Sequence, residues 1–470
     1  MRSPSTTARI HLTSAGCWFV HGRGQQQVVC RLGGRLKDAV FDPGERVMIR
    51  KVKGTRDILP PESRLWVEVE AVANRIFGGF GYEEIRLPLL EPTELFVRSV
   101  GEDTDIVSKE MYTFADRKGR SLTLRPEGTA GVARAYIENG LGQRPMPLRV
   151  SYLGPMFRYE KMQRGRYRQF AQIGIELIGA ATPQADVEVL LVLHSFLTEL
   201  GFDDLVIVVN NLGDPEDRPR FIEGFKNELE PHRAELCADC QRRWDANPLR
   251  ILDCKVERCR ELVADTTPVA EVVSEEARAH VEAVENGLAS LEIPVQRSPR
   301  LVRGIDYYLR TVFEVVSPKL GENTVICGGG RYDRLISDLG GSQVPATGFA
   351  IGEDRLIEVL PEPFRRRVLD RPTVAVLPIG EKANSAALAI ARLLVRQGIS
   401  AQTEVTDRSL KAGFKWAGKI GAQAAVILGE DEIAAGSAIV RDLQRGEQET
   451  VALEEVPGYV ERLIASDSET

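Results

Sequence analysis

Residues 303–308 of this chain read Arg-Gly-Ile-Asp-Tyr-Tyr, and they place a cation, a flexible glycine, a carboxylate and two phenols within one turn. Arginine carries a fixed charge and five donors in a planar fork. Tyrosine adds a ring face and a hydroxyl group that donates or accepts. These groups suit a site for a polar, aromatic-ring substrate next to a phosphate. A strand start with half-buried tyrosines would explain them equally well, because residues 311–316 are rich in β-branched types and predict a strand.

A second set of polar residues lies in two further predicted strands, residues 154–160 and 170–177, which a basic loop joins. Gln172 and Glu176 alternate with apolar residues, so they share one strand face, about 13 Å apart at about 3.3 Å per residue. Arg158 belongs to the paired strand. The pattern predicts a polar floor that holds a small ligand, with an arginine over its phosphate. The alternative is a half-exposed strand with two solvent-facing polar residues.

Three more segments carry polar residues at predicted turns and helix starts. Residues 123–129, TLRPEGT, place the Glu127 carboxylate before a glycine and a hydroxyl residue, where it could receive an α-amino group. Residues 327–333, CGGGRYD, predict a tight turn into a helix, and glycines allow backbone to approach a ligand closely. Residues 348–355, GFAIGEDR, end on Arg355. A turn or helix start without any ligand would explain each segment by itself.

The polar inventory favours chemistry by cations and carboxylates over a histidine base. The chain has neither a Gly-x-x-x-x-Gly-Lys-Ser/Thr phosphate loop nor a dinucleotide fingerprint. Phosphoryl and nucleotidyl transfer rest mostly on positioning and charge stabilisation, which suits this inventory. None of the five histidines lies beside residue 303 or in the strands above: His11, His21, His194, His232 and His280.

Length and composition set outer bounds on the class of protein. A chain of 470 residues predicts more than one domain, and 43% hydrophobic with 27% charged residues is ordinary for a globular protein. The net charge of −7 argues against indiscriminate coating of nucleic acid, so a nucleic-acid partner would have to meet local basic patches. Seven cysteines do not suggest a secreted disulfide framework. No apolar run is long enough to cross a bilayer.

Residues 303–308, with their following Thr-Val-Phe-Glu strand, resemble a signature of histidyl-tRNA synthetases, and the resemblance extends from residue 53 to near the C-terminus. Residues 154–170 resemble motif 2 of class II aminoacyl-tRNA synthetases, and residues 348–355 resemble motif 3. The resemblance implies an α+β fold, with an antiparallel class II catalytic sheet, a helical insertion and a C-terminal α/β anticodon-binding domain. It implies a histidine–tRNA ligase, which activates L-histidine with ATP and Mg²⁺ to histidyl-adenylate and charges tRNA(His).

The resemblance also suggests roles for individual residues. It places Arg158 and Arg355 at the ATP phosphates, and we predict that Arg303 contacts the α-phosphate, so that these three arginines carry the catalytic step. Residues 161–163, Lys-Met-Gln, depart from the usual Arg-Pro-Gln of the loop that meets the tRNA acceptor end. We expect the Glu127 carboxylate to bind the substrate ammonium. Glu176 and Tyr308 are expected to bind the imidazole, and Gln172 and Tyr307 to shape the pocket. Three further residues are expected at the histidine: Gly128, Thr129 and Tyr332.

The chain divides into a leader and two domains. We expect residues 1–47 to be a disordered leader or the result of a start called too early, with Met48 as the start. Six basic residues and no acidic one in residues 1–37 also permit an organelle transit peptide, the alternative to a cytoplasmic protein. Residues 48–363 form the expected catalytic domain, with a charged, helical insertion at about 213–299. Residues 372–470 alternate strand and helix, which predicts a small α/β domain.

The resemblance implies two partners. Residues 87–90, LPLL, stand where motif 1 forms the dimer strand, so we expect a homodimer. The helix from about residue 410 begins with a run of basic residues, and in the family this element faces the tRNA. Its basic side chains, with the preceding turn, are Arg408, Lys411, Lys415 and Lys419.

The insertion holds four of the cysteines. Cys237 and Cys240 form a C-x-x-C pair, followed by Cys254 and Cys259, and such a set permits tetrahedral zinc. The loose spacing of the last pair, and a family chemistry that needs no zinc, favour a chain without it.

Two other functions are compatible with parts of the sequence. One is a non-catalytic, synthetase-like regulatory subunit, such as the one that joins ATP phosphoribosyltransferase. Such paralogues tend to lack the C-terminal domain and parts of the 303–308 motif, and this chain keeps both. The other is a module that binds RNA without turnover, against which the three arginines argue.

Overall fold

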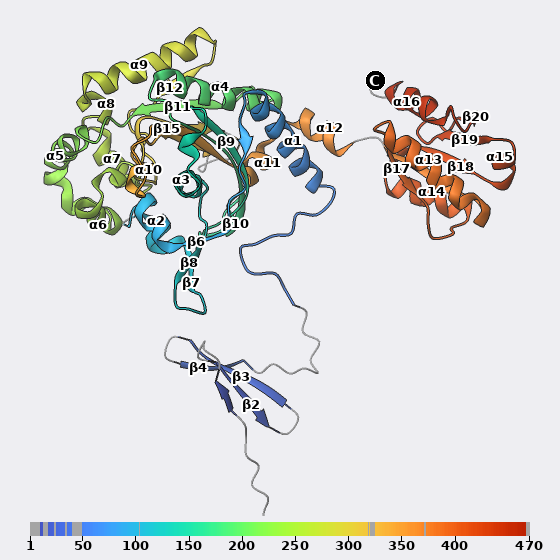
Figure 1. The fold of residues 1–470 in the computed structure, drawn as a ribbon, viewed down its shortest axis with the longest axis horizontal. Coiled ribbons are helices and arrows are strands. Elements are labelled where there is room, and N and C mark those ends of the chain that lie inside the picture. Colours follow the sequence, from blue (N-terminus) through green and yellow to red (C-terminus); the bar gives the residue numbers. More distant parts are fainter. Residues whose placement is uncertain are drawn as a thin grey trace, which may run out of the picture. The chain divides into compact units, whose positions relative to one another are not determined.

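The computed structural model describes residues 49–466, except for residues 103, 318, 320–324 and 371–372. It also describes four strands that precede residue 49. Residues 1–56 and 57–470 form two units (Figure 1). The first contains an antiparallel sheet in the order β1-β2-β3-β4. Its strands are β1 (Ile10–Leu12), β2 (Cys17–Gly22), β3 (Gln25–Leu32) and β4 (Arg35–Ala39). The interpretation of residues 1–47 as a leader, an early start or a transit peptide stays a prediction.

An eight-stranded sheet in the order β12-β11-β13-β14-β15-β10-β9-β5 forms the core of the catalytic part of the second unit, residues 57–369 (Figure 1). All neighbouring strands are antiparallel except at the two edges, where β12 pairs with β11 and β5 with β9 in parallel. The predicted antiparallel catalytic sheet is confirmed. Its strands are β5 (Glu83–Glu84), β9 (Leu148–Phe157), β10 (Gln169–Ile178), β11 (Val206–Asn211), β12 (Val295–Arg297), β13 (Leu309–Val316), β14 (Val325–Arg331) and β15 (Ala346–Gly352).

Helices cover one face of this sheet. Ile173, Ile175 and Leu177 of β10 point into the core that these helices form, so the residues between them face the other way, as the alternation predicted. The first of these helices, α1, ends at Gly79, and Phe80, which follows it, is exposed. The covering helices are α1 (Ser63–Gly79), α4 (Pro183–Glu199), α9 (Glu275–Ser290), α11 (Glu353–Val359) and α12 (Glu362–Leu369).

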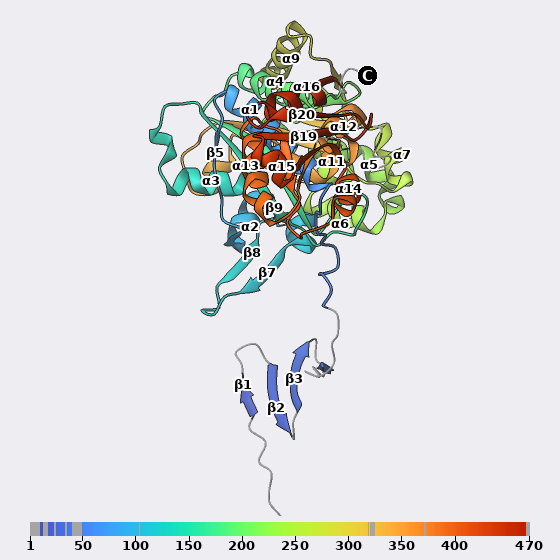
Figure 2. The same cartoon turned by 90° about the vertical axis from the view of Figure 1, so that its right-hand side faces the viewer.

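The opposite face of the sheet is only partly covered. Helices α3 (Thr129–Glu138) and α10 (Leu335–Asp338) pack there in one hydrophobic cluster with Tyr152 of β9. A small antiparallel sheet leads into α3, in the order β6-β8-β7, and Figure 2 shows β7 and β8 side by side. Its strands and the helix that follows β6 are β6 (Leu90–Pro92), α2 (Thr93–Val100), β7 (Tyr112–Ala115) and β8 (Ser121–Leu124). This arrangement leaves open the part of the sheet face that carries Gln172.

The insertion after β11 is a cluster of helices with a hydrophobic core of its own. The later part of the predicted insertion behaves differently, because α9 packs on α4 and β13 and the strand β12 joins the catalytic sheet. Helix α9, although rich in Glu and Ala, therefore buries Ala277, His280, Val281, Val284 and Leu288. The helices of the separate cluster are α5 (Asp217–Leu229), α6 (Ala238–Ala246), α7 (Glu257–Ala264) and α8 (Val269–Val272).

The C-terminal part is a five-stranded sheet in the order β17-β16-β18-β19-β20, with helices packed on it. The first three strands are parallel and alternate with α13 (Asn384–Arg396) and α14 (Leu410–Lys419), which confirms the predicted α/β domain. Two antiparallel strands and two helices follow that the sequence analysis left out. The remaining elements are β16 (Thr373–Pro378), β17 (Ser400–Thr403), β18 (Ala422–Leu428), α15 (Glu430–Ala434), β19 (Ser437–Asp442), β20 (Gln448–Ala452) and α16 (Val456–Ser466).

The glycine-rich segment 327–333 is not the tight turn that the sequence suggested. Its glycines lie inside β14, between β13 and β15. A Cβ on Gly328 would lie 2.1 Å from the Arg303 guanidinium, and a Cβ on Gly329 would lie 2.3 Å from the carbonyl oxygen of Gly348. Glycine is required because other groups occupy the side-chain space, and the helix α10 begins only at Leu335.

A buried charge network joins α4, α9 and the sheet. Arg331 is fully buried, and its Nη2 donates to Asp186 Oδ1 at 2.9 Å. His280 Nε2 and Thr311 Oγ1 each lie 2.8 Å from Asp186 Oδ2. Burial works against ionisation of Asp186, but the hydrogen bond from His280 and the charge of Arg331 hold the pKa of Asp186 below its usual value. The Asp186 carboxylate is thus the shared acceptor that ties these elements together.

We expect Asp186→Asn to lower the free energy of unfolding by about 3–5 kcal/mol, because it removes the fully buried partner of Arg331 and leaves only the partly exposed Asp333 to pair with that charge. Urea unfolding followed by tryptophan fluorescence measures the change. Glu94→Gln is the matched control, since Glu94 pairs with Arg98 on an exposed helix face and its removal should cost at most about 0.5 kcal/mol. Equal effects of the two substitutions would contradict this account of the network.

Within the part of the chain that the structure describes, no helix is both long and apolar enough to cross a membrane.

Candidate active site

A cavity of about 450 Å³ opens on the uncovered face of the catalytic sheet. The sheet carries no large side chains at this point, because small residues lie side by side on β14 and β15, where Gly328 pairs with Ala350. All three predicted catalytic arginines line it, namely Arg158, Arg303 and Arg355. The predicted histidine-binding residues that line it are Glu127, Thr129, Gln172, Tyr307 and Tyr308.

Arg303 lies flat on the sheet at one side of the cavity. Its Nη1 donates to Glu314 Oε1 of β13, and Glu314 pairs with Gly328 across the strands. Burial would lower the pKa of Arg303, but the Glu314 carboxylate outweighs burial and raises it. Arg303 is therefore a fixed cation whose guanidinium is positioned by a carboxylate and by the absence of a side chain at Gly328.

Further cations lie near Arg355, the arginine of helix α11. Burial, followed by the charges of Arg166 and Arg158, lowers the pKa of Arg355 to about 10. Arg158 and Arg166 share one carboxylate, Glu160, at 3.9 and 3.1 Å, so these guanidinium groups lie close together and the protein neutralises them only in part. Arg158 is oriented by its Nε, which donates to the carbonyl oxygen of Pro126 at 2.8 Å. An anionic ligand would relieve the repulsion among these arginines.

Glu127 lies at the N-terminus of α3. Its two oxygens accept hydrogen bonds from the backbone N–H groups of Thr129 at 2.6 Å and Ala130 at 2.9 Å. Burial raises the pKa of Glu127, although these N–H groups oppose the shift. The sequence predicted a turn and a helix start in residues 123–129, and the structure has this turn between β8, which ends at Leu124, and α3, which begins at Thr129. The turn holds a buried carboxyl group rigidly at the cavity wall.

Glu176 and Tyr332 lie behind the residues that line the cavity. Glu176 accepts hydrogen bonds from the hydroxyl groups of Thr129, at 2.7 Å, and Tyr332. Burial raises the pKa of Glu176 to about 8, and the two hydroxyl donors only partly offset that rise. The Tyr307 ring lies 4.7 Å from the Tyr308 ring and 5.5 Å from the Tyr332 ring, between centroids. These phenols and the carboxyl group form one aromatic, polar recess.

Gln172 and Glu176 share a strand face as predicted, but the half-exposed alternative is wrong. The exposed fractions of the two residues are 8% and 1%. Gln172 Oε1 has no hydrogen-bond partner among the described residues, which is costly for a buried polar atom. An acceptor left without a donor at a cavity wall points to a ligand that donates a hydrogen bond.

Several residues of the site were missed by the sequence analysis. Tyr152 of β9 fills the space above Gly128 and Gly174, where added Cβ atoms would lie 2.3 and 2.4 Å from its ring. Gly128 therefore makes room for Tyr152, and it does not line the cavity itself. Arg166 and Glu314 stood within segments already singled out, and their charge was the available signal.

The insertion contributes to the same cavity. Asp253 and Lys255 line it, although they lie about fifty residues before Arg303 in the sequence. The carboxylate of Asp306, which belongs to the 303–308 motif, accepts two hydrogen bonds from Asn247 Nδ2, each 2.8 Å long. Asp306 thus holds the 303–308 turn against the insertion.

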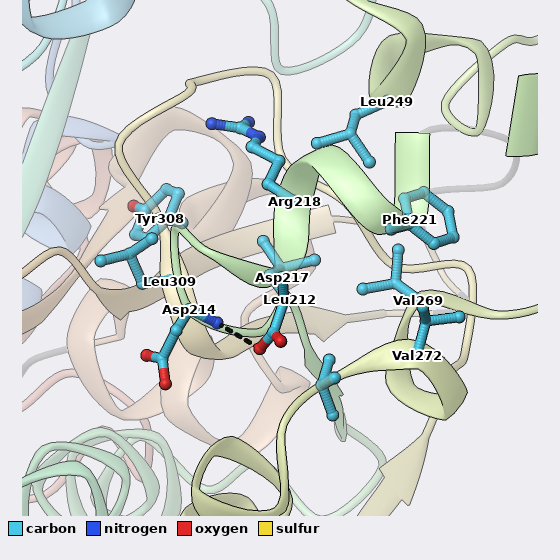
Figure 3. A pocket seen from close by; sticks show the side chains of 11 residues that line it. Leu212, Asp214, Asp217, Arg218, Phe221, Leu249, Val269, Val272, Tyr308 and Leu309 are labelled. Atoms are coloured by element: carbon cyan, nitrogen blue, oxygen red, sulfur yellow. Dashed lines mark hydrogen bonds between the residues drawn. The ribbon is translucent and has the colours of Figure 1, made fainter. Parts of the chain in front are cut away.

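A second, much smaller cavity lies behind Tyr308, between α5 and the sheet (Figure 3). Its volume of about 20 Å³ is close to the room that one water needs. The Asp214 N–H donates to Asp217 Oδ2 at its edge, at 3.0 Å. This cavity separates Tyr308 from the insertion and is too small to be the site of an organic substrate.

An antiparallel sheet with arginines at the motif 2 and motif 3 positions around one open cavity defines a class II aminoacyl-tRNA synthetase. Comparisons with known proteins agree. A family described as "Histidyl-tRNA synthetase" matches residues 54–213 and 242–356, and one described as "Anticodon binding domain" matches residues 373–463. The chain belongs to the histidyl-tRNA synthetase family.

Individual relatives extend this result over most of the chain. A protein named histidine–tRNA ligase from Nitratidesulfovibrio vulgaris is 47% identical over 89% of this chain and 99% of its own length. One from Desulfatibacillum aliphaticivorans is 45% identical over 89% and 99%. Apo histidyl-tRNA synthetase of S. aureus superposes with a TM-score of 0.71 at 34% identity, over 88% of this chain and 99% of that one.

A structure titled as an ATP phosphoribosyltransferase regulatory subunit/histidyl-tRNA synthetase, from Bacillus halodurans, is also similar. Its TM-score is 0.60 at 24% identity, and the match covers 82% of this chain and 99% of that chain. At that identity the similarity shows a shared fold only.

Proposed function

We propose that this protein is a histidine–tRNA ligase, which forms histidyl-adenylate from L-histidine and ATP and transfers the histidyl group to tRNA(His). The observation that carries the proposal is the single cavity in which Arg158, Arg303 and Arg355 meet the Glu127 wall and the recess around Glu176. Cations suit a nucleotide, and the recess suits a ring with hydrogen-bonding nitrogens.

In the first step the substrate carboxylate attacks the α-phosphorus of ATP, and pyrophosphate leaves. The carboxylate is already ionised, so no general base is required. Negative charge gathers on the phosphate oxygens in the transition state, and fixed cations stabilise it without reorganising. Arg158 binds the α-phosphate and the substrate carboxylate, Arg303 binds the α-phosphate, and Arg355 lies against the outer phosphates.

Magnesium would enter with the nucleotide. Mg²⁺ prefers oxygen ligands and is usually held by one or two carboxylates together with substrate phosphates. The cavity wall offers carboxylates of this kind, at Glu160 and Glu314, although each is paired with an arginine. The residues present therefore fit a metal that is held mainly by ATP. When bound, the ion would neutralise part of the phosphate charge.

The recess around Glu176 selects histidine. Glu127 receives the substrate ammonium, Glu176 and Tyr308 bind the imidazole nitrogens, and Gln172 and Tyr307 complete the walls. A recess built from buried hydrogen-bonding groups rejects side chains that leave these groups unpaired. Thr129 and Tyr332 fix the Glu176 carboxyl group, and Gly128 lets Tyr152 close the recess from behind.

Two exposed regions would meet the tRNA. The loop between β9 and β10 exposes Lys161 and Gln163 beside the cavity mouth, which suits the acceptor end. In the C-terminal domain, α14 exposes Lys411, Lys415 and Lys419, spaced four residues apart on one helical face. Phosphate contacts through these lysines would make tRNA binding sensitive to salt.

We further propose a cytoplasmic homodimer. Leu89 and Leu90 are 42% and 46% exposed beside the residues that resemble the motif 1 dimer strand. An exposed apolar pair at this position suits burial against a second copy. The regular strand predicted there is largely absent, since residues 85–89 lie between β5 and β6.

Aminoacylation of tRNA(His) with labelled histidine tests the proposed function. We expect charging of tRNA(His) that depends on ATP, with no charging by other amino acids, and ATP–pyrophosphate exchange that depends on histidine. Histidine binding without exchange or charging would contradict the proposal and favour a non-catalytic subunit. Exchange without charging would support the formation of histidyl-adenylate and contradict the transfer of the histidyl group to tRNA(His).

A further inference from the structure

The four cysteines of the insertion lie together. Their sulfur atoms are all within 4.8 Å of one another, although Cys237 and Cys259 are separated by a helix, a turn and part of a second helix. The Cys237 and Cys254 sulfurs are 3.8 Å apart. Zinc–sulfur bonds of about 2.3 Å in a tetrahedron require sulfurs about 3.8 Å apart, so little movement would seat a metal.

The surroundings of the four sulfurs resemble those of a structural metal site. Three of the cysteines are buried and Cys237 is partly buried, so the cluster is closed to substrate. The backbone N–H of Cys237 donates to the Cys259 sulfur at 3.2 Å, the kind of outer hydrogen bond that orients metal ligands. Four closed thiol ligands are the donor set of a structural zinc, while a catalytic zinc keeps an open position.

Disulfides are the main alternative for such a cluster. Two cross-links among four cysteines would need an oxidising compartment, and within a reducing one the same spacing is more often metal-binding. The matched family leaves out residues 214–241, which carry Cys237 and Cys240. Cys254 and Cys259 lie within the second matched range, residues 242–356, so the family match covers only two of the four cysteines.

The segment between the cysteines reaches the active site. Arg250 Nη1 donates to the carbonyl oxygen of Gly304 at 3.1 Å, and Asn247 donates to both oxygens of Asp306. Asp253 and Lys255, the neighbours of Cys254, line the substrate cavity. Whatever fixes Cys254 therefore fixes one wall of the cavity and the turn that carries Arg303.

We propose that Cys237, Cys240, Cys254 and Cys259 bind one structural Zn²⁺ as thiolates, and that this ion holds residues 247–255 of the insertion against the turn at 303–308. The sequence analysis favoured a chain without zinc because the last two cysteines are loosely spaced. The structure removes that objection, since the turn before α7 brings Cys259 back to the N-terminus of α6.

Metal analysis of the full chain, purified under reducing conditions without chelators, tests the site. We expect one zinc per chain, and we expect Cys237→Ser with Cys254→Ser to abolish zinc binding. Cys17→Ser with Cys30→Ser is the matched control, which should keep the zinc because both residues lie outside the insertion. Less than about one tenth of a zinc per chain, iron in its place, or disulfides found by mass spectrometry without reduction would overturn the proposal.

Cobalt substitution covers the case in which the serine variants fail to fold. Full-length wild-type protein refolded with Co²⁺ should show the intense visible and sulfur-to-metal absorption bands of a tetrahedral thiolate site. A spectrum of octahedral, oxygen-bound Co²⁺ would overturn the proposal. The zinc content and the cobalt spectrum do not depend on catalysis. The zinc proposal can therefore be wrong while the proposed function is right, and the proposed function can be wrong while the zinc proposal is right.

The link to the active site rests on the proposed function and has its own test. Removing the metal from the wild-type enzyme with a competing chelator should raise the KM for ATP several-fold and lower the exchange rate, and added zinc should restore both. The KM for ATP is expected to change more than the KM for histidine, because residues 247–255 contact the turn that carries Arg303. An enzyme that loses its zinc with no change in either constant would overturn the positioning role.

Discussion

Arg303→Ala is expected to slow histidine-dependent ATP–pyrophosphate exchange about 10²–10³-fold, the usual cost of removing one preorganised donor to a developing anion. Histidine binding, measured by calorimetry without ATP, should change little, because the Glu176 recess stays intact. The loss would lie in kcat more than in the KM for histidine. Such a split indicates an interaction made in the transition state.

The fold of the Arg303 variant needs a control, because Glu314 would lose its partner. The double variant Arg303→Ala with Glu314→Gln removes both charges and should be equally inactive while unfolding like the wild type. Arg297→Ala is the matched arginine control, since the exposed Arg297 pairs with the partly buried Glu285, does not line the cavity and should leave exchange unchanged. Wild-type exchange in Arg303→Ala would remove this residue from the mechanism.

Glu176→Gln should affect binding and stability in opposite directions. Loss of the buried carboxylate that pairs with the imidazole should lower kcat/KM for histidine about 10²–10³-fold, the range for a buried, charged hydrogen bond. The empty protein, by contrast, should become more stable near pH 8, as judged by the midpoint of urea unfolding. The reason is the raised pKa of Glu176.

The sign follows from proton linkage. The folded-state pKa of Glu176 is about 8, while an unfolded glutamate has a pKa of about 4.3. The unfolded state therefore loses its proton first, and the native state becomes less favoured as the pH rises from about 4.3 towards about 8. Below both values the two proteins should unfold alike. Glutamine removes this pH dependence.

Glu353→Gln is the matched control for the Glu176 substitution. Burial, followed by the charges of Glu70 and Asp354, raises the pKa of Glu353 to about 9, and neither of its oxygens has a hydrogen-bond partner among the described residues. Its replacement should also stabilise the protein at high pH, but the KM for histidine should not change. Equal loss of histidine binding in both variants would contradict the assignment of Glu176 to the imidazole.

The parts of the site that the sequence could predict are those with local signals. Alternation in β10 placed Gln172 and Glu176 on one face, because side-chain direction in a strand follows from sequence position alone. The turn before α3 placed Glu127, since proline and glycine mark such turns. The family motifs then indicated that Arg158, Arg303 and Arg355 share one site, and the cavity contains all three.

The parts that could not be predicted depend on contacts between distant segments. Gly328 lies in a strand, and glycine is needed there because the distant Arg303 side chain occupies the space above it, which no local sequence pattern reports. Asp253 and Lys255 enter the cavity only because the insertion folds back on the 303–308 turn. The apolar face of α9 was hidden in a stretch rich in Glu and Ala, where alanine fits a core as well as a surface.

A crystal structure of the full chain with a non-hydrolysable histidyl-adenylate analogue tests the central claim most directly. The account predicts the phosphate mimic within hydrogen-bond distance of Arg158 and Arg303. The imidazole should lie between Glu176 and Tyr308, and the ammonium should lie at Glu127. An analogue bound elsewhere, or bound here with Arg303 still turned to Glu314 and away from the phosphate mimic, would contradict it.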